Sequence, residues 1–356
     1  MSTRQNHGRG WADISLANLV ANARAVLAAQ PGARLLPMVK ANAYGLGVIP
    51  CARALRSVSP WGYGVATLAE AAELRAAGFG GPIVVFTPAT LTDLPRVREL
   101  DVRSVLDVPA VVGRWDRPFH LEIDTGMSRC GVRWDDAAAL AACRSPHLEG
   151  VFTHLHSADT RAETVPVQWE RFTAARGVLG DRPPLLHVAN SAGSWRVPER
   201  LDLVRPGVFL YGGLLAPDLP TPAPVLALRA PVVSLRCVRE GDSVSYGGDW
   251  TAPTDTTVAT LGIGYADGIP RSVQGRAAVL LRGRRFPVVG RVTMDFVMVD
   301  VGVDGGGAAV GDVATLIGRD GDETITLDTF AGWAGTISYE IIARLGGRLE
   351  RRYDTA

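Results

Sequence analysis

RLLPMVKA, residues 34–41, is the first of eight short apolar runs that decide the fold of this chain. Each run has the length of a strand, and several of the connecting segments have the apolar spacing of a helix. Nearly continuous apolar strands that alternate with helices predict a parallel sheet, and eight of them predict a (β/α)8 barrel. The other runs are WGYGVAT (61–67), PIVVFTP (82–88), RSVLD (103–107), FHLEIDTG (119–126), LEGVFTHLH (148–156), LLHVANSA (185–192) and LVRPGVFLYG (203–212).

The connecting segments differ in how clearly they predict a helix. TLAEAAELRAAGF and VQWERFTAARGVL have amphipathic helical spacing, and SLANLVANARAVLAAQ predicts a further helix that begins after an N-cap at Ser15. The connection between the fourth and fifth runs, VPAVVGRW, is short. It is therefore the weakest unit of the predicted barrel.

The pattern changes at the proline-rich segment LLAPDLPTPAPV (214–225), which predicts a linker. Beyond it, alternating segments with glycine turns predict an antiparallel β domain, which ends with a helix near TISYEIIARLG. We expect a barrel domain at residues 1–222 and a β domain at 223–356, with the first ~10 residues able to pack on the latter. Residues 302–308 are expected to form a turn.

The composition excludes several classes of partner. The chain has 356 residues and a net charge of +1, so it shows no electrostatic footprint for nucleic acid or an anionic membrane surface. The start, MSTRQNHGRG, lacks the apolar core of a signal peptide, and no apolar run is as long as a membrane span. Its four cysteines, without a CxxC pair, predict free thiols in the cytoplasm.

Candidate catalytic and binding residues follow five of the predicted strands. Active sites of (β/α)8 barrels lie at the carboxyl ends of the strands, and phosphate sites commonly follow strands seven and eight. A lysine that faces a phosphate site predicts pyridoxal 5′-phosphate held as a Schiff base. The candidates are Lys40, Asp124, Arg129, His154, His156, Asn190, Ser191, Arg205 and Gly207.

His154 and His156 form an HxH pattern, which also occurs in metal-dependent barrel hydrolases. A metal site needs further ligands on other strands, and only His187 is an obvious candidate. We therefore predict no metal site. His156 is expected to form a hydrogen bond within the barrel mouth, and His120 to be structural or exposed to solvent.

Nine motifs in order along the chain resemble those of the alanine racemases, a family of PLP-dependent enzymes with a barrel and a β domain. MVKANAYGLG (38–47) resembles the cofactor-lysine motif of that family. The remaining motifs are DTGMSRCG (124–131), FTHLHSAD (152–159), HVANSAG (187–193), RPGVFLYG (205–212), SYGGDW (245–250), GYADGIPR (264–271), VGRVTMD (289–295) and TISYEII (336–342).

The resemblance implies a role for each matching position. Lys40 would hold the cofactor and act as one catalytic base, and Tyr265 of a partner subunit would act as the other. Arg129 and the amide of the partner's Met294 would contact substrate, with Glu122 and the partner's Asp295 in support. The cofactor-binding set would be Lys40, Tyr44, His154, Asn190, Ser191, Arg205, Gly207, Val208 and Tyr339.

The chemistry of racemisation explains these residue types. One base must remove the proton from one face of Cα, and an acid must supply a proton on the other face. A tyrosine has an unperturbed pKa near ~10, so its surroundings must lower it. His154 and Arg205 match the family residues that lie behind this tyrosine. An arginine that faces the pyridine nitrogen would restrain the electron sink, because it is always protonated.

Four positions differ from the family pattern: Leu46, where histidine is common; Thr293, where cysteine is common; Ser128, where glycine is usual; and Glu122. Members commonly have at position 122 a lysine that is modified to a carbamate, whose negative charge orients the arginine after DTGM. Glu122 shares a strand face with His120 and Asp124, and it supplies an anion without carbon dioxide.

The leading interpretation is a homodimeric cytoplasmic alanine racemase that supplies D-alanine for peptidoglycan. Racemisation of serine, lysine or a broader range of amino acids is an alternative, because Glu122 and Leu46 bear on the pocket region. A non-catalytic PLP-binding protein is a further alternative, although binding alone would not need Tyr265. A decarboxylase of related architecture is disfavoured, because no acidic motif with a cysteine occurs in the second half.

Overall fold

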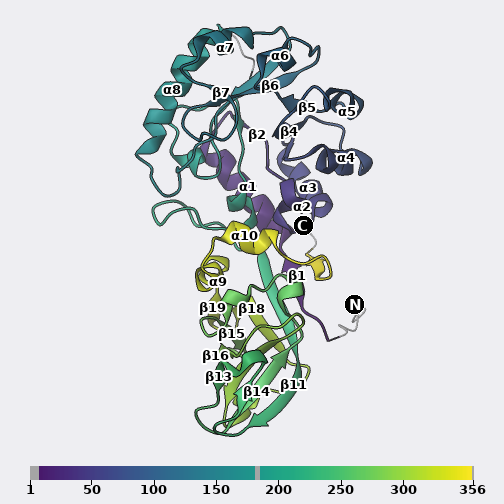
Figure 1. The fold of residues 1–356 in the computed structure, drawn as a ribbon, viewed down its shortest axis with the longest axis vertical. Coiled ribbons are helices and arrows are strands. Elements are labelled where there is room, and N and C mark those ends of the chain that lie inside the picture. Colours follow the sequence, from purple (N-terminus) through teal and green to yellow (C-terminus); the bar gives the residue numbers. More distant parts are fainter. Residues whose placement is uncertain (1–7, 181–184, 355–356) are drawn as a thin grey trace. The chain divides into compact units, whose positions relative to one another are not determined.

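The computed structural model describes residues 8–180 and 185–354, and the chain divides into two compact units (Figure 1). Leu19–Ala223 form the first unit, and Met1–Asn18 together with Pro224–Ala356 form the second. In the described part of the chain, no helix is long and apolar enough to cross a membrane. The proline-rich segment before Val225 contains neither helix nor strand. Its end is fixed by Asn22, whose Oδ1 accepts a hydrogen bond from the Ala223 N–H at 2.7 Å.

The first unit is the predicted barrel. Each of the eight apolar runs contains a strand, which is shorter than the run because the ends of the runs turn into loops. Six strands form a parallel sheet in the order β3-β4-β5-β6-β8-β9, and β10 pairs with β2 in parallel. The barrel strands are β2 (Arg34–Leu35), β3 (Tyr63–Val65), β4 (Ile83–Pro88), β5 (Arg103–Val105), β6 (Phe119–Asp124), β8 (Leu148–Phe152), β9 (Leu185–His187) and β10 (Leu203–Val204).

Two sets of single contacts close the barrel. A parallel bridge joins Met38, beyond β2, to Gly64 in β3. On the other side, the Arg205 N–H donates to the Ala189 carbonyl at 2.8 Å, and the Asp202 N–H donates to the Leu186 carbonyl at 3.0 Å. The pair β2–β10 therefore lies between β9 and β3, which confirms the predicted closed arrangement.

The helix predicted to begin after Ser15 does so, and a second helix has a capping box at its start. Ser15 Oγ accepts a hydrogen bond from the Asn18 N–H at 3.2 Å, and Thr67 with Glu70 forms a capping box. α6 is the short connection between the fourth and fifth barrel strands. The helices are α1 (Leu16–Ala29), α2 (Lys40–Tyr44), α3 (Val48–Leu55), α4 (Leu68–Ala76), α5 (Leu94–Glu99), α6 (Pro109–Val112), α7 (Ala137–Ala142) and α8 (Thr164–Leu179).

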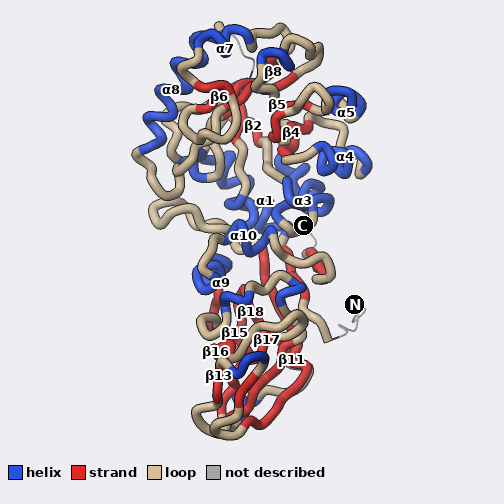
Figure 2. Tube along the Cα trace, in the orientation of Figure 1, coloured by secondary structure: helices blue, strands red, loops and turns tan. Residues whose placement is uncertain are grey.

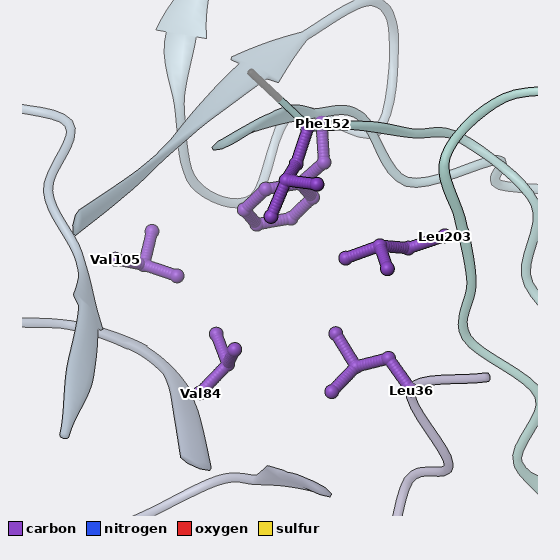
Figure 3. Packing of buried hydrophobic residues seen from close by; sticks show 6 residues of the cluster. Leu36, Val84, Val105, Phe152 and Leu203 are labelled. Carbon is purple, nitrogen blue, oxygen red and sulfur yellow. The ribbon is translucent and has the colours of Figure 1, made fainter. Parts of the chain in front are cut away.

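An apolar layer fills part of the barrel interior. Figure 3 shows five of its side chains, four from strands and Leu36 from directly after β2, that point toward a common centre. They are Leu36, Val84, Val105, Phe152 and Leu203, and Leu185 completes the cluster. Because side chains alternate across a strand, these positions identify which residues of each strand face inward.

The second unit is the predicted β domain (Figure 2). Among its described residues, nine strands form one sheet in the order β19-β18-β15-β16-β17-β14-β11-β1-β20, and β11 also pairs with β18. All pairings are antiparallel except that of β1 with β20. The strands are β1 (Trp11–Ile14), β11 (Leu226–Val238), β14 (Thr256–Leu261), β15 (Ala278–Leu281), β16 (Arg284–Val289), β17 (Val297–Gly302), β18 (Val313–Asp320), β19 (Glu323–Ile325) and β20 (Glu350–Tyr353).

Smaller elements complete both units. β7 (Val132–Arg133) pairs with β6 in the barrel, whereas β12 (Ser243–Val244) and β13 (Trp250–Thr251) form a hairpin in the β unit. The helix expected near TISYEII is α10 (Ser338–Ala343), which follows α9 (Leu327–Ala334). The expected turn at 302–308 contains a single 3-10 turn.

The apolar layer provides a test of barrel stability. Leu36→Ala should lower the free energy of unfolding by about 2–5 kcal/mol, because Leu36 is fully buried and a cavity would remain. Leu91→Ala is the matched control, since that side chain is 42% exposed and its removal leaves no cavity. Urea denaturation followed by circular dichroism measures both. Equal losses for the two variants would contradict the packing described here.

Candidate active site

Lys40 lies at the carboxyl end of the first barrel strand, at the start of an unusual turn. The residues that follow it, Ala41 to Tyr44, have φ values between 52° and 55°, so α2 is a left-handed turn. Such a turn costs roughly 1–2 kcal/mol per residue for L-amino acids. Strain of this kind persists only where the surrounding structure maintains it, and it is common at functional sites.

Hydrogen bonds from several directions hold this turn. The Ala41 N–H donates to Glu70 Oε1 at 2.7 Å, and Asn42 Oδ1 accepts from the Val48 N–H at 2.7 Å. The Gly45 N–H donates to the Ala41 carbonyl, also at 2.7 Å. The backbone that directly follows Lys40 is therefore held in a fixed conformation. Sequence reasoning did not predict it, although AYGLG with its two glycines signals an irregular backbone.

The charge state of Lys40 depends on its surroundings. Burial lowers the pKa of its ammonium group, the positive charge of Arg129 lowers it further, and Glu70 acts in the opposite direction. At neutral pH a larger fraction of Lys40 is therefore the neutral amine than for a lysine in water.

A small cradle lies beside Lys40's strand, where strands seven and eight end, because β10, the eighth strand, pairs with β2. Ser191 Oγ accepts a hydrogen bond from the Gly207 N–H at 2.8 Å. A Cβ atom at Gly207 would lie 2.2 Å from the Tyr44 hydroxyl oxygen, so only glycine leaves room for this tyrosine. Val208 begins a 3-10 turn. The loop that contains Ser191 is held by the Asn190 side chain, whose Nδ2 donates to the Leu155 carbonyl and whose Oδ1 accepts from the Gly193 N–H.

The Tyr44 side chain is held firmly in this cradle. Its ring stacks on that of Tyr211 with 4.8 Å between the centroids. Burial raises the pKa of the Tyr44 hydroxyl to about 12, so this group is a neutral hydrogen-bonding group rather than a base.

Arg205 is buried inside the barrel, and both of its terminal guanidinium nitrogens form hydrogen bonds. Nη2 donates to the Thr153 carbonyl at 2.8 Å, and Nη1 donates to His187 Nδ1 at 2.8 Å and to the His187 carbonyl. The guanidinium carbon lies 4.9 Å from the centre of the Phe152 ring. Burial lowers the pKa of Arg205 to about 10, while Glu122 raises it, so the group stays charged at neutral pH.

Two further titratable groups, His154 and Glu122, lie near Arg205. Burial, followed by the charges of Arg205, Arg129 and Lys40, lowers the pKa of His154 to about 3, so His154 is neutral. Burial raises the pKa of Glu122 above its usual range, although Arg205 and Arg129 both lower it. The shift is therefore opposite in direction to the one expected from Arg129 alone.

The loop that carries Arg129 is built around Asp124. Its Oδ1 accepts hydrogen bonds from the Gly126 N–H at 2.9 Å and from the Ser128 N–H at 3.0 Å. Ser128 has a φ of 54°, in the left-handed region that favours glycine. This conformation explains why glycine is suited to that position, and it makes Ser128 a mildly strained residue here.

Tyr265 lies in the β unit, on the 3-10 turn Tyr265–Asp267. Its N–H donates to the Thr293 carbonyl at 2.9 Å, and the Ala266 N–H donates to the Met294 carbonyl at 3.1 Å. The buried carboxylate of Asp267 accepts hydrogen bonds from the Gly264 N–H and from Arg9. The turn is thus rigid, while Tyr265 and Met294 remain 42% and 52% exposed.

The candidate residues fall into two groups. The barrel unit contains Lys40, Tyr44, Glu122, Arg129, His154, Asn190, Ser191, Arg205, Gly207 and Val208, and the β unit contains Tyr265, Met294, Asp295 and Tyr339. Arg348 donates to Asp295 Oδ1 at 2.7 Å, and Tyr339 is half-buried on α10.

The structure also clarifies other histidines. His156 is exposed, and its Nδ1 lies 2.6 Å from Ser157 Oγ. His187, the candidate third metal ligand, instead contacts His120 and Arg205. No group of three metal-binding side chains occurs within residues 8–180 and 185–354. His120 is fully buried and contacts His187 and Glu149. The strand face that it shares with Glu122 is the sequence feature that indicates this buried position.

Two family models cover almost the whole chain. Residues 14–214 match the alanine racemase N-terminal domain, and residues 225–353 match the alanine racemase C-terminal domain. An alanine racemase of Deinococcus radiodurans is 42% identical, covering 97% of this chain and 99% of that protein. One from Symbiobacterium thermophilum is 40% identical, covering 96% of each. The chain belongs to the alanine racemase family.

Solved structures agree with this assignment. Alanine racemase from Bacillus anthracis, determined with bound L-Ala-P, has a TM-score of 0.90 and 32% identity, covering 98% of this chain and 96% of that one. Alanine racemase from Bartonella henselae, determined with covalently bound pyridoxal phosphate, has a TM-score of 0.90 and 27% identity, covering 97% and 99%.

The close approach of Tyr44 to Gly207 provides a second test. Gly207→Ala should destabilise the protein by about 1–3 kcal/mol, because the new methyl group displaces the Tyr44 hydroxyl. Gly81→Ala is the matched control, since nothing lies within 4 Å of a Cβ at that position. Differential scanning fluorimetry reports both. A Gly207→Ala protein that melts like the control would show that Tyr44 does not occupy this place.

Proposed function

We propose that this protein is a PLP-dependent alanine racemase that interconverts L-alanine and D-alanine with two bases, Lys40 and Tyr265 of the partner subunit. The observation that carries the proposal is the combination of a partly buried lysine with a lowered pKa, a hydroxyl-and-glycine cradle and a buried arginine at one barrel mouth. Membership of the alanine racemase family supports the same activity.

The barrel residues fit pyridoxal 5′-phosphate. Tyr44 and Ser191 offer hydroxyl groups beside Gly207, which has no side chain of its own, and together with the backbone of Val208 they suit a phosphate group. Tyr339 would contribute a further hydroxyl. When bound, the cofactor supplies an electrophilic carbon for the amino group and an electron sink that acidifies the Cα–H bond.

Arg205 would face the pyridine nitrogen of the cofactor. Its two terminal nitrogens already donate to Thr153 and His187, so its orientation is fixed before any ligand arrives. Because a guanidinium only donates hydrogen bonds, it keeps that ring nitrogen unprotonated. This arrangement restrains the electron sink and favours prompt return of a proton to Cα over side reactions.

Lys40 and Tyr265 would serve opposite faces of Cα. Burial and Arg129 favour the neutral amine of Lys40, which is the form that accepts a proton. Tyr265 is presented on a rigid and partly exposed turn, as a base offered to a second chain would be. His154 and Arg205 of that second chain would lie behind it.

Substrate recognition would rest on few groups. Arg129 and the amide of the partner's Met294 would hold the substrate carboxylate, with Glu122 and the partner's Asp295 in support. Leu46, one of the positions that raised the alternative of a broader substrate range, is fully buried and cannot contact substrate directly. Leu46 therefore gives no direct support to a broader substrate range.

We further propose that the active unit is a homodimer with shared sites and that it works in the cytoplasm, supplying D-alanine for peptidoglycan. The division of candidate residues between a barrel unit and a β unit supports the dimer. The exposed Tyr265 and Met294 side chains support it as well.

Complementation between two inactive variants tests the shared site. Lys40→Ala and Tyr265→Phe should each lose nearly all activity, because each removes one base from both sites. After subunit exchange, half of the dimers are mixed and have one intact site, so about a quarter of wild-type activity should return. Racemisation is measured by polarimetry, and native mass spectrometry confirms exchange. Complete exchange without any recovered activity would place both bases on one chain.

Glu122 provides a test of the anion beside Arg129. The wild-type rate should not change when bicarbonate is removed at constant pH, because a carboxylate needs no carbon dioxide. Glu122→Gln should lower kcat by roughly tenfold to a hundredfold, since Arg129 loses its orienting charge. Glu122→Lys should recover activity only with bicarbonate. A folded Glu122→Gln enzyme with unchanged kcat and KM would reduce Glu122 to an ordinary barrel residue.

A further inference from the structure

A chain of polar side chains lies inside the barrel, beside the apolar layer. In the sheet register His120 is opposite Val105, and His187 is opposite Phe152; both apolar partners face the interior. His120 and His187 therefore point inward as well, and both are fully buried. Two buried imidazoles in a barrel interior need hydrogen-bond partners, because an unpaired polar group there is costly.

The chain connects Arg205 to Glu149 through these two histidines. Arg205 Nη1 lies 2.8 Å from His187 Nδ1, and His187 Nε2 lies 2.8 Å from His120 Nδ1. His120 Nε2 lies 3.3 Å from Glu149 Oε2, which also accepts a hydrogen bond from Arg103 Nε at 3.1 Å. All five residues belong to the barrel unit, on β5, β6, β8, β9 and the end of β10.

The ends of this chain determine the direction of every hydrogen bond. Arginine can only donate, so His187 Nδ1 must accept, and its proton is on Nε2. That proton is donated to His120 Nδ1, which places the His120 proton on Nε2. The Glu149 carboxylate accepts it. One arrangement of protons therefore satisfies all three contacts with both histidines neutral.

The electrostatics of the chain agree with this arrangement. Burial lowers the pKa of His120 and, more strongly, that of His187, so both imidazoles are neutral. Burial raises the pKa of Glu149, but hydrogen bonds from His120 and Arg103 outweigh it and lower the pKa overall. Glu149 is therefore an anion at neutral pH, as the chain requires.

Two local features of the backbone make the chain possible. The pairing of β6 with β8 shifts by one residue between Phe119, opposite Leu148, and His120, opposite Gly150. Glu149 is the extra residue of this bulge, and bulges redirect side chains. Gly150 then makes room, since a Cβ there would lie 2.8 Å from the His120 ring. Bulge and glycine thus combine to bring Glu149 against His120.

We propose that Glu149 and His120 are positioning residues for Arg205, whose guanidinium they orient toward the cofactor through His187. This inference rests on the proposed function, because it assigns to Arg205 the place facing the pyridine nitrogen. A purely structural role would require only that the buried groups be paired. The positioning role requires in addition that the proton arrangement at Glu149 reach Arg205, three side chains away.

The test compares two substitutions of Glu149 in the holoenzyme. Glu149→Gln keeps an oxygen that can accept from His120, whereas Glu149→Met keeps the length of the side chain without an acceptor. In Glu149→Met, Arg103 can donate to His120 Nε2, and this forces the proton of each histidine onto Nδ1. A His187 N–H would then face the Arg205 N–H, and the two donors repel each other.

The proton positions can be read directly. The protein has six histidines, so selective 15N-histidine labelling and NMR can assign the tautomers of His120 and His187. Wild type and Glu149→Gln should show both protons on Nε2. Glu149→Met should shift them toward Nδ1, move the visible absorption band of the bound cofactor and lower kcat about tenfold, with a smaller change in KM. Val105→Ala, which perturbs the neighbouring apolar layer, is the control for destabilisation and should leave tautomers and absorption unchanged.

The two hypotheses fail in different ways. A wild-type protein that binds the cofactor but does not racemise alanine contradicts the proposed function. An active wild-type enzyme with a proton on His187 Nδ1 overturns the positioning role. A folded Glu149→Met enzyme with shifted tautomers but an unchanged absorption band and kcat also overturns it, because the effect would then stop before Arg205.

Discussion

The burial of one guanidinium group, that of Arg205, constrains much of the barrel. A buried charge must be hydrogen-bonded, and a guanidinium cannot lose its proton easily even when burial lowers its pKa to about 10. The Thr153 and His187 carbonyls and the His187 ring meet this demand. The Phe152 ring lies beside the group at 4.9 Å. Strands six, seven and eight of the barrel are thereby held in one register around a single side chain.

Rigidity is also the common property of the residues around Lys40. The left-handed turn from Ala41 to Tyr44 carries backbone strain, and the hydrogen bonds of Glu70 and Asn42 maintain it. On the neighbouring seventh and eighth strands, Gly207 and Ser191 form a cradle that allows no larger residue at position 207. Such preorganisation suits chemistry that depends on placing one amine on one face of a planar group.

The sequence was sufficient to predict the fold, because each barrel strand lies in an apolar run and several of these runs alternate with segments of helical spacing. It also identified Lys40, Ser191 and Gly207 as neighbours of one barrel mouth, since strand ends of a barrel meet there. It could not reveal the left-handed turn, which depends on tertiary hydrogen bonds. Nor could it reveal the pairing of His120 with Glu149, because that contact needs a β-bulge and the absence of a side chain at Gly150.

The path of the chain through the β unit has a consequence for biosynthesis. β1 is made near the start of translation, yet its antiparallel partner β11 begins at Leu226 and its parallel partner β20 begins at Glu350. The barrel residues, Leu19–Ala223, are contiguous and can fold as they leave the ribosome. The four residues of β1 can pair with β11 first, and their other edge stays unpaired until β20 has been made. A nascent chain that lacks β20 therefore has an open sheet edge at β1.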